Sequence, residues 1–209
     1  MGSSSPNTPP SEGGLLRDMH NLPNRLTMAR IVLAIVLFGV LSFPSQIAYL
    51  AGLVLFLLAA GTDWLDGYFA RKLGLVTTLG RILDPFADKL IISGTFIFLA
   101  ASPRMLETAF GLHPWIVVII IGRELLITVI RSFMEQQGVD FSANWPGKIK
   151  MALQCVVVVV AMLYLSFVEA APGEPVWLWW ALVVSTYAAL LSTVYSGAIY
   201  VVAAAKHLK

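Results

Sequence analysis

A short and otherwise apolar stretch of the chain contains four aspartates: Asp63, Asp66, Asp84 and Asp88. A carboxylate at membrane depth is costly, so it usually faces a cavity and marks a functional site. A single such aspartate can serve as an ion-pair or proton-relay residue, but four that converge repel one another unless a cation lies among them. Carboxylate oxygens are the ligands that hard divalent cations prefer. The stretch therefore predicts a divalent-metal site with these four aspartates as ligands.

The spacing around Asp63 predicts a binding face for a phosphorylated ligand. Residues three, four, seven and eight positions after Asp63 return to the same side of an α-helix. Small residues there let a base or sugar approach the backbone, and an arginine can bond a phosphate in bidentate geometry. We expect this face to consist of Asp66, Gly67, Ala70 and Arg71, with the hydroxyl of Thr77 reaching a phosphate or ribose.

A second candidate face precedes the aspartates. Pro23 can begin a helix, and Asn24, Thr27 and Arg30 then follow at spacings of three on one side. This face is either a helix cap with a snorkelling arginine or a further part of the ligand site.

Four cations follow the aspartates in the chain: Arg123, Arg131, Lys148 and Lys150. Arg123 and Arg131 are eight residues apart, so they project similarly from one helix. Arg123 either forms a structural pair with Glu124 or joins Arg131 in an anion site. The two lysines would satisfy membrane topology alone, but four cations near four aspartates favour an anionic second substrate.

The composition is that of a single-domain, all-α integral membrane protein. The chain has 209 residues, of which 58% are hydrophobic and only 12% are charged. Its one cysteine, Cys155, cannot form an intrachain disulfide. We expect a disordered tail at 1–14 and one membrane domain at 15–209, beginning with an amphipathic segment at 15–25 that lies along the membrane surface. Six apolar runs are near or above the ~20 residues needed to cross a bilayer: 26–43, 47–71, 78–101, 114–136, 146–167 and 175–207.

The distribution of charge predicts how these spans are oriented. The connections at 44–46, 102–113 and 168–174 contain a single basic residue, Arg104, whereas most other basic residues lie at the opposite ends of the spans. Because basic residues accumulate on the cytoplasmic side, we expect both termini and the aspartates to be cytoplasmic. The active site is then expected at the cytoplasmic ends of the second and third spans.

The pattern D-x2-D-G-x2-A-R-x8-G-x3-D-x3-D is met at every specified position from Asp63 to Asp88. It resembles the signature of the CDP-alcohol phosphatidyltransferase family. The resemblance implies a bacterial cell-membrane transferase that acts on a CDP-linked lipid alcohol, uses two Mg²⁺ or Mn²⁺ ions, and forms a homodimer. It also implies that Asp88 is the general base as well as a ligand, and that the segment with Asn24 and Thr27 lies close to the nucleotide site.

Further motifs are most similar to those of members that transfer a phosphatidyl group from CDP-diacylglycerol to sn-glycerol 3-phosphate. These motifs are N-L-P-N-x-L-T-x2-R, G-R-E-L-L-I-T-x2-R and G-K-I-K. The resemblance implies that Arg123, Arg131, Lys148 and Lys150 hold the acceptor phosphate. Inositol phosphate would also need a cationic pocket, so it remains an alternative acceptor. A cation-coupled transporter is a more distant alternative, because it explains neither Gly67, Ala70 and Arg71 nor the four cations.

Overall fold

The computed structural model describes residues 22–73, 78–138, 145–170, 173 and 175–207, with only the backbone described for 22–24, 26, 63–73, 78–82, 84, 146 and 207. Within these ranges the chain is helical and contains no strand. The helices are α2 (Leu22–Leu41), α3 (Gln46–Leu73), α4 (Thr78–Ala100), α5 (Pro103–Glu107), α6 (Pro114–Gln136), α7 (Trp145–Ala170) and α8 (Val176–His207). The six long helices match the six predicted apolar runs to within four residues at each end. The expected tail at 1–14 lies outside the described residues.

Two features of the helix boundaries differ from the expectation. The short helix α5 was not predicted, and Pro103 occupies its first turn, where the missing N–H of proline is not needed. Helix α2 begins at Leu22, so the last residues of the predicted surface segment, 22–25, belong to the first long helix.

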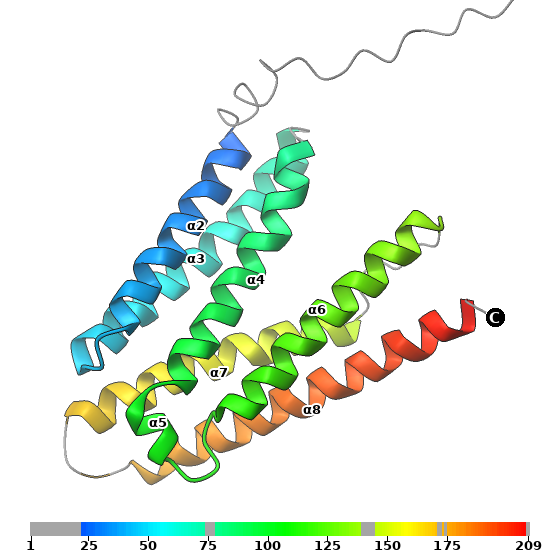
Figure 1. Ribbon diagram of the computed structural model, residues 1–209. Helices are drawn as coiled ribbons and strands as arrows, with labels where there is room; N and C mark the ends of the chain where they lie inside the picture. The colour runs from blue at the N-terminus through cyan, green and yellow to red at the C-terminus, as the bar shows by residue number, and fades with distance from the viewer. Residues whose placement is uncertain (1–21, 74–77, 139–144, 171–172, 174, 208–209) are drawn as a thin grey trace, which may run out of the picture.

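The long helices alternate in direction between two ends of the molecule. Helix α2 packs against α3 and α4, while α8 packs against α6 and α7. Figure 1 shows that these two groups diverge from the end that carries α5. The start of α2 and the end of α8 both lie away from α5. Helix α7 joins the groups, because it packs against α3 and α4 as well as α8.

The outer surface of the bundle is apolar, as expected of a membrane protein. Large apolar side chains are exposed along several helices, including Val32 and Ile35 on α2, Val129 on α6, and Val184 and Leu191 on α8. An apolar surface of this extent is unfavourable in water. By length and composition, Gly147–Ala170 and Val176–Lys206 are able to cross a membrane, and Thr27–Leu41 and Gln46–Thr62 are shorter apolar segments.

Helices α2 and α4 approach closely at Gly94. A Cβ atom on Gly94 would lie 2.1 Å from Cζ of Phe38, and the Phe38 ring is itself stacked on Phe98 with centroids 5.3 Å apart. Any side chain at this position therefore forces the Phe38 ring or the two helices to move.

We expect Gly94→Ala to lower the midpoint of thermal unfolding of the detergent-purified protein, because overpacking typically costs about 1–3 kcal/mol. Gly39→Ala on α2 is the matched control, since a Cβ there meets nothing within 4 Å. Equal unfolding midpoints for the two variants would show that the α2–α4 contact is looser than described.

Candidate functional site

The predicted general base, Asp88, is paired with an arginine from another helix. Oδ1 of Asp88 on α4 accepts a hydrogen bond from Nη1 of Arg30 on α2 at 2.7 Å. The Arg30 side chain is 1% exposed and that of Asp88 is 32% exposed. Thr27, one turn before Arg30, is fully buried. Helix α2 therefore contributes directly to the surroundings of Asp88.

A cavity of about 270 Å³ opens beside Asp88 between α4, α6 and α7. We call it the α4–α6–α7 cavity. Its polar lining comprises Asp88, Lys89, Glu124, Arg131, Lys150 and Gln154, together with Ser93. The cavity thus places the predicted base next to two of the four predicted acceptor-binding cations.

A second pocket, of about 490 Å³, adjoins this cavity and is called the basic pocket. The two share Lys89, Glu124, Arg131 and Lys150 in their linings. All four predicted cations line the basic pocket, together with Lys89. Among the described residues of this lining, the acidic side chains are Glu124 and Glu135. The excess positive charge suits an anionic ligand.

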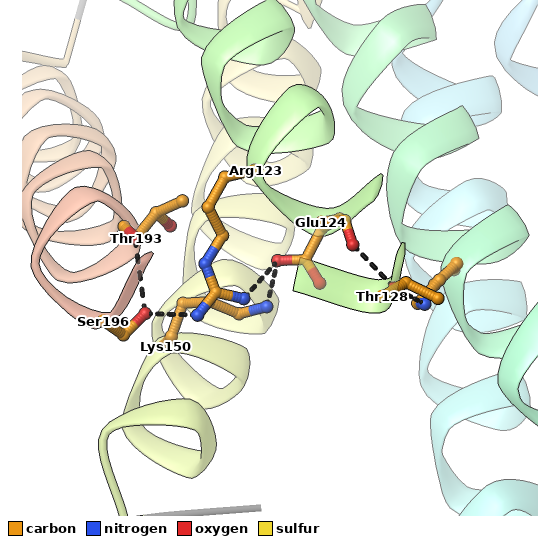
Figure 2. A network of polar contacts seen from close by, with 7 residues as sticks. Arg123, Glu124, Thr128, Lys150, Thr193 and Ser196 are labelled. Atoms are coloured by element: carbon orange, nitrogen blue, oxygen red, sulfur yellow. Dashed lines mark hydrogen bonds and ion pairs between the residues drawn. The ribbon is translucent and has the colours of Figure 1, made fainter. Parts of the chain in front are cut away.

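The network in Figure 2 holds two of these cations around one carboxylate. Oε1 of Glu124 contacts Nη1 of Arg123 at 3.5 Å and also accepts a hydrogen bond from Nζ of Lys150. Arg123 in turn donates from Nη2 to Oγ of Ser196 on α8 at 2.7 Å. Arg123 therefore forms the pair with Glu124 that was one of its two predicted roles, and it also lines the basic pocket together with Arg131.

The other cations of the pocket also contact neighbouring side chains. Nε of Arg131 lies 4.0 Å from Oε1 of Glu135, and Nζ of Lys148 lies 5.7 Å from the centroid of the Trp145 ring. Lys89 donates to the hydroxyl of Thr128 on α6. These contacts leave the lining cationic, so the pocket keeps its preference for an anion.

The predicted metal ligands occupy the two helix ends that flank residues 74–77. Asp63 and Asp66 lie in the last turns of α3, and Asp84 and Asp88 lie in the first three turns of α4. The side chains of Asp63, Asp66 and Asp84 lie outside the described residues. The four aspartates would offer carboxylate oxygens, which are the ligands that a hard divalent cation prefers.

Several other predicted contacts also lie outside the described part of the chain. They are the side chains of Asn24, Gly67, Ala70 and Arg71, and the whole of Thr77. Of the predicted nucleotide-binding residues, only the side chain of Thr27 is described. It lies one turn from Arg30, at the side of α2 that faces the site.

Sequence reasoning missed three features of this site. The pairing of Arg30 with Asp88 joins residues 58 positions apart in the chain, and no local pattern specifies such a contact. Lys89 was not among the predicted cations, although it follows Asp88 directly. Gln154 carries no charge, so it did not stand out within its apolar helix.

Comparisons with known proteins show the family to which the chain belongs. A model of the CDP-alcohol phosphatidyltransferase family matches residues 20–188. The CDP-diacylglycerol–glycerol-3-phosphate 3-phosphatidyltransferase of Bacillus subtilis (strain 168) is 40% identical over 159 residues, which cover 70% of this chain and 78% of the relative. The enzyme of the same name from Mycoplasma genitalium is 33% identical over 181 residues, covering 85% and 74% of the two chains.

One relative carries a different name. A cardiolipin synthase (CMP-forming) of Oryza sativa subsp. japonica is 34% identical over 149 residues, which cover 68% of this chain and 45% of the relative. The family model matches most of the chain, and several transferases are at least 33% identical to it. The chain belongs to the CDP-alcohol phosphatidyltransferase family and is a transferase.

Proposed function

We propose that this enzyme transfers the phosphatidyl group of CDP-diacylglycerol to sn-glycerol 3-phosphate and releases CMP. The observation that carries the proposal is the α4–α6–α7 cavity, which joins Asp88 to the cations of the basic pocket. An acceptor with a hydroxyl at one end and a phosphate at the other matches that pattern of charge. The printed names of the B. subtilis and M. genitalium relatives support the same donor and acceptor.

Asp88 is the general base of the proposed reaction. Its carboxylate takes the proton from the acceptor hydroxyl, and the hydroxyl oxygen attacks the phosphorus that bears the diacylglycerol. The bond from that phosphorus to the bridging oxygen breaks, and CMP leaves with the electron pair. The ion pair with Arg30 fixes one carboxylate oxygen and thereby orients the group. Direct in-line attack predicts inversion of configuration at phosphorus, so retention would count against it.

The family is known to use divalent metal ions, and the residues that would hold them here are Asp63, Asp66, Asp84 and Asp88. Bound Mg²⁺ or Mn²⁺, two ions by the resemblance, would neutralise the pyrophosphate of the donor and stabilise the leaving phosphate. The nucleotide and its phosphates would be bound by Asn24, Thr27, Asp66, Gly67, Ala70, Arg71 and Thr77.

We expect EDTA to abolish CMP release, because the charge of the pyrophosphate is then no longer neutralised. Adding back Mg²⁺ or Mn²⁺ in excess is expected to restore CMP release. Adding Na⁺ or K⁺ alone, without any divalent cation, is not expected to restore it. Full activity after dialysis against EDTA would contradict the assignment of the aspartates as metal ligands.

The proposal also includes the placement of the chain in a membrane. Helices α2, α3, α4, α6, α7 and α8 form six spans of a bacterial cell-membrane protein, in the single domain 15–209. Their alternation in direction places the end of α3, the start of α4, the end of α6, the start of α7 and the end of α8 away from α5 (Figure 1). The basic pocket draws its charges from the same end, which is the cytoplasmic one by the distribution of basic residues. A homodimer is the proposed assembly.

Acceptor-dependent CMP release tests the proposed function. Purified protein in detergent receives CDP-diacylglycerol and Mg²⁺, with sn-glycerol 3-phosphate, inositol phosphate, phosphatidylglycerol or serine as acceptor. We expect turnover with sn-glycerol 3-phosphate. Phosphatidylglycerol is included because one relative is named a cardiolipin synthase. Turnover with inositol phosphate or phosphatidylglycerol, but not with sn-glycerol 3-phosphate, would leave the family chemistry in place. It would overturn the proposal that sn-glycerol 3-phosphate is the acceptor.

A further inference from the structure

Gln154 is a buried amide in the wall of the α4–α6–α7 cavity, and its nitrogen has no hydrogen-bond partner in the part of the chain that the structure describes. It lies on α7 four residues after Lys150, so both side chains project from the same face of the helix. Gln154 is 2% exposed and lines the cavity with Asp88, Arg131 and Lys150. Its Nε2 atom is buried and has no hydrogen-bond partner among the described residues. A buried polar group without a partner is costly, so its retention favours a ligand that supplies one.

The position of Gln154 relative to the charges suggests which part of a ligand it meets. Lys150 and Arg131 suit a phosphate, and Asp88 suits the hydroxyl that loses its proton. An uncharged amide contributes little to either end, but it can donate to and accept from a neutral hydroxyl. In sn-glycerol 3-phosphate, the C2 hydroxyl lies between the phosphate and the attacking C1 hydroxyl.

We propose that Gln154 recognises the C2 hydroxyl of the acceptor and determines specificity for it. This inference rests on the proposed function, because it assumes that sn-glycerol 3-phosphate occupies the cavity. A site built to hydrogen-bond a substrate hydroxyl disfavours an analogue that lacks it, because the buried partner is then left unpaired. Removing the amide removes the hydrogen bond that only sn-glycerol 3-phosphate can make, and with it the discrimination.

The test compares two acceptors that differ only in this hydroxyl. We would measure kcat/KM for sn-glycerol 3-phosphate and for 3-hydroxypropyl phosphate at saturating CDP-diacylglycerol. The wild-type enzyme is expected to prefer sn-glycerol 3-phosphate by about 10- to 100-fold. Gln154→Met, which keeps a similar length, is expected to lose most of this preference. Activity with 3-hydroxypropyl phosphate should change by less than about threefold, because that acceptor makes no use of the amide.

Thr186→Val is the matched control. Thr186 on α8 is fully buried, and its Oγ1 also lacks a partner among the residues described, but it is not part of the cavity lining. Its replacement should leave the acceptor preference unchanged. If Gln154→Met does not fold, Gln154→Asn serves instead, since the shorter amide cannot reach the same point and should weaken the preference.

The outcomes separate this inference from the function on which it rests. Equal loss with both acceptors in a folded Gln154→Met enzyme would indicate a structural role and overturn the inference. An unchanged preference in that variant would overturn it as well. Wild-type protein that releases no CMP with sn-glycerol 3-phosphate would overturn the proposed function, and the assignment of Gln154 with it.

Discussion

Asp88→Asn is expected to lower CMP release by at least about 10²- to 10⁴-fold, the usual contribution of a general base. The asparagine keeps the size of the side chain and an oxygen that can accept from Arg30, but it cannot take a proton from the acceptor. Loss of a metal ligand would add to the effect. The rate is measured with saturating CDP-diacylglycerol, sn-glycerol 3-phosphate and Mg²⁺.

Two controls separate catalysis from folding in this experiment. Thermal unfolding of Asp88→Asn should remain cooperative, because Asp88 is 32% exposed and its pair with Arg30 is only partly desolvated. Glu107→Gln removes an exposed carboxylate on α5, at the other end of the molecule, and should leave CMP release unchanged. More than a tenth of the wild-type rate in Asp88→Asn would exclude Asp88 as the base.

Lys150→Met is expected to raise the KM for sn-glycerol 3-phosphate by about 10- to 100-fold, which corresponds to the loss of one charge-assisted hydrogen bond. Lys150 is buried and lines both the α4–α6–α7 cavity and the basic pocket. Its replacement therefore removes a cation from the point where the two adjoin. The KM for CDP-diacylglycerol should change little, because the predicted nucleotide contacts come from α2 and α3.

Lys206→Met provides the matched control, since Lys206 is an exposed cation near the end of α8 that does not line the basic pocket. We expect wild-type values of KM for both substrates. The contrary result would be that Lys150→Met raises the KM for CDP-diacylglycerol and leaves the KM for sn-glycerol 3-phosphate unchanged. That result would show that the basic pocket binds the donor, CDP-diacylglycerol, and not the acceptor.

The network around Glu124 explains how several cations can be kept together before the acceptor binds. Arg123 and Lys150 would repel each other in an apolar bundle, and the shared carboxylate of Glu124 offsets that repulsion. Ser196 fixes the far side of the Arg123 guanidinium through α8. A single acid between two cations leaves net positive charge, so the network stabilises the pocket without neutralising it.

Much of the fold follows from the sequence because membrane spans are specified locally. Long apolar runs bounded by proline or by charged residues gave helix ends within four residues, as at Pro114 and Gln136 of α6. The short helix α5 was missed because five residues between two apolar runs carry no periodic signal. The alternating directions of the long helices follow from the short connections between them.

The site was predictable to the extent that its residues are charged. Arg123, Arg131, Lys148 and Lys150 are isolated cations near apolar segments, and the structure brings all four to one pocket. The contact of Arg30 with Asp88 depends on how α2 packs against α4, which the sequence does not specify. Gln154 was missed because a neutral amide is conspicuous only once it is known that the side chain is buried and that its nitrogen has no hydrogen-bond partner among the described residues.

Identification of the lipid product tests the central claim most directly. Wild-type protein and Asp88→Asn are incubated with CDP-diacylglycerol, Mg²⁺ and isotopically labelled sn-glycerol 3-phosphate, and the extracted lipids are analysed by mass spectrometry while CMP is quantified. The account predicts labelled phosphatidylglycerophosphate in amounts equal to CMP from the wild type, and both products reduced by at least about 10²-fold in Asp88→Asn. CMP without labelled lipid, or labelled lipid at the wild-type rate from Asp88→Asn, would contradict it.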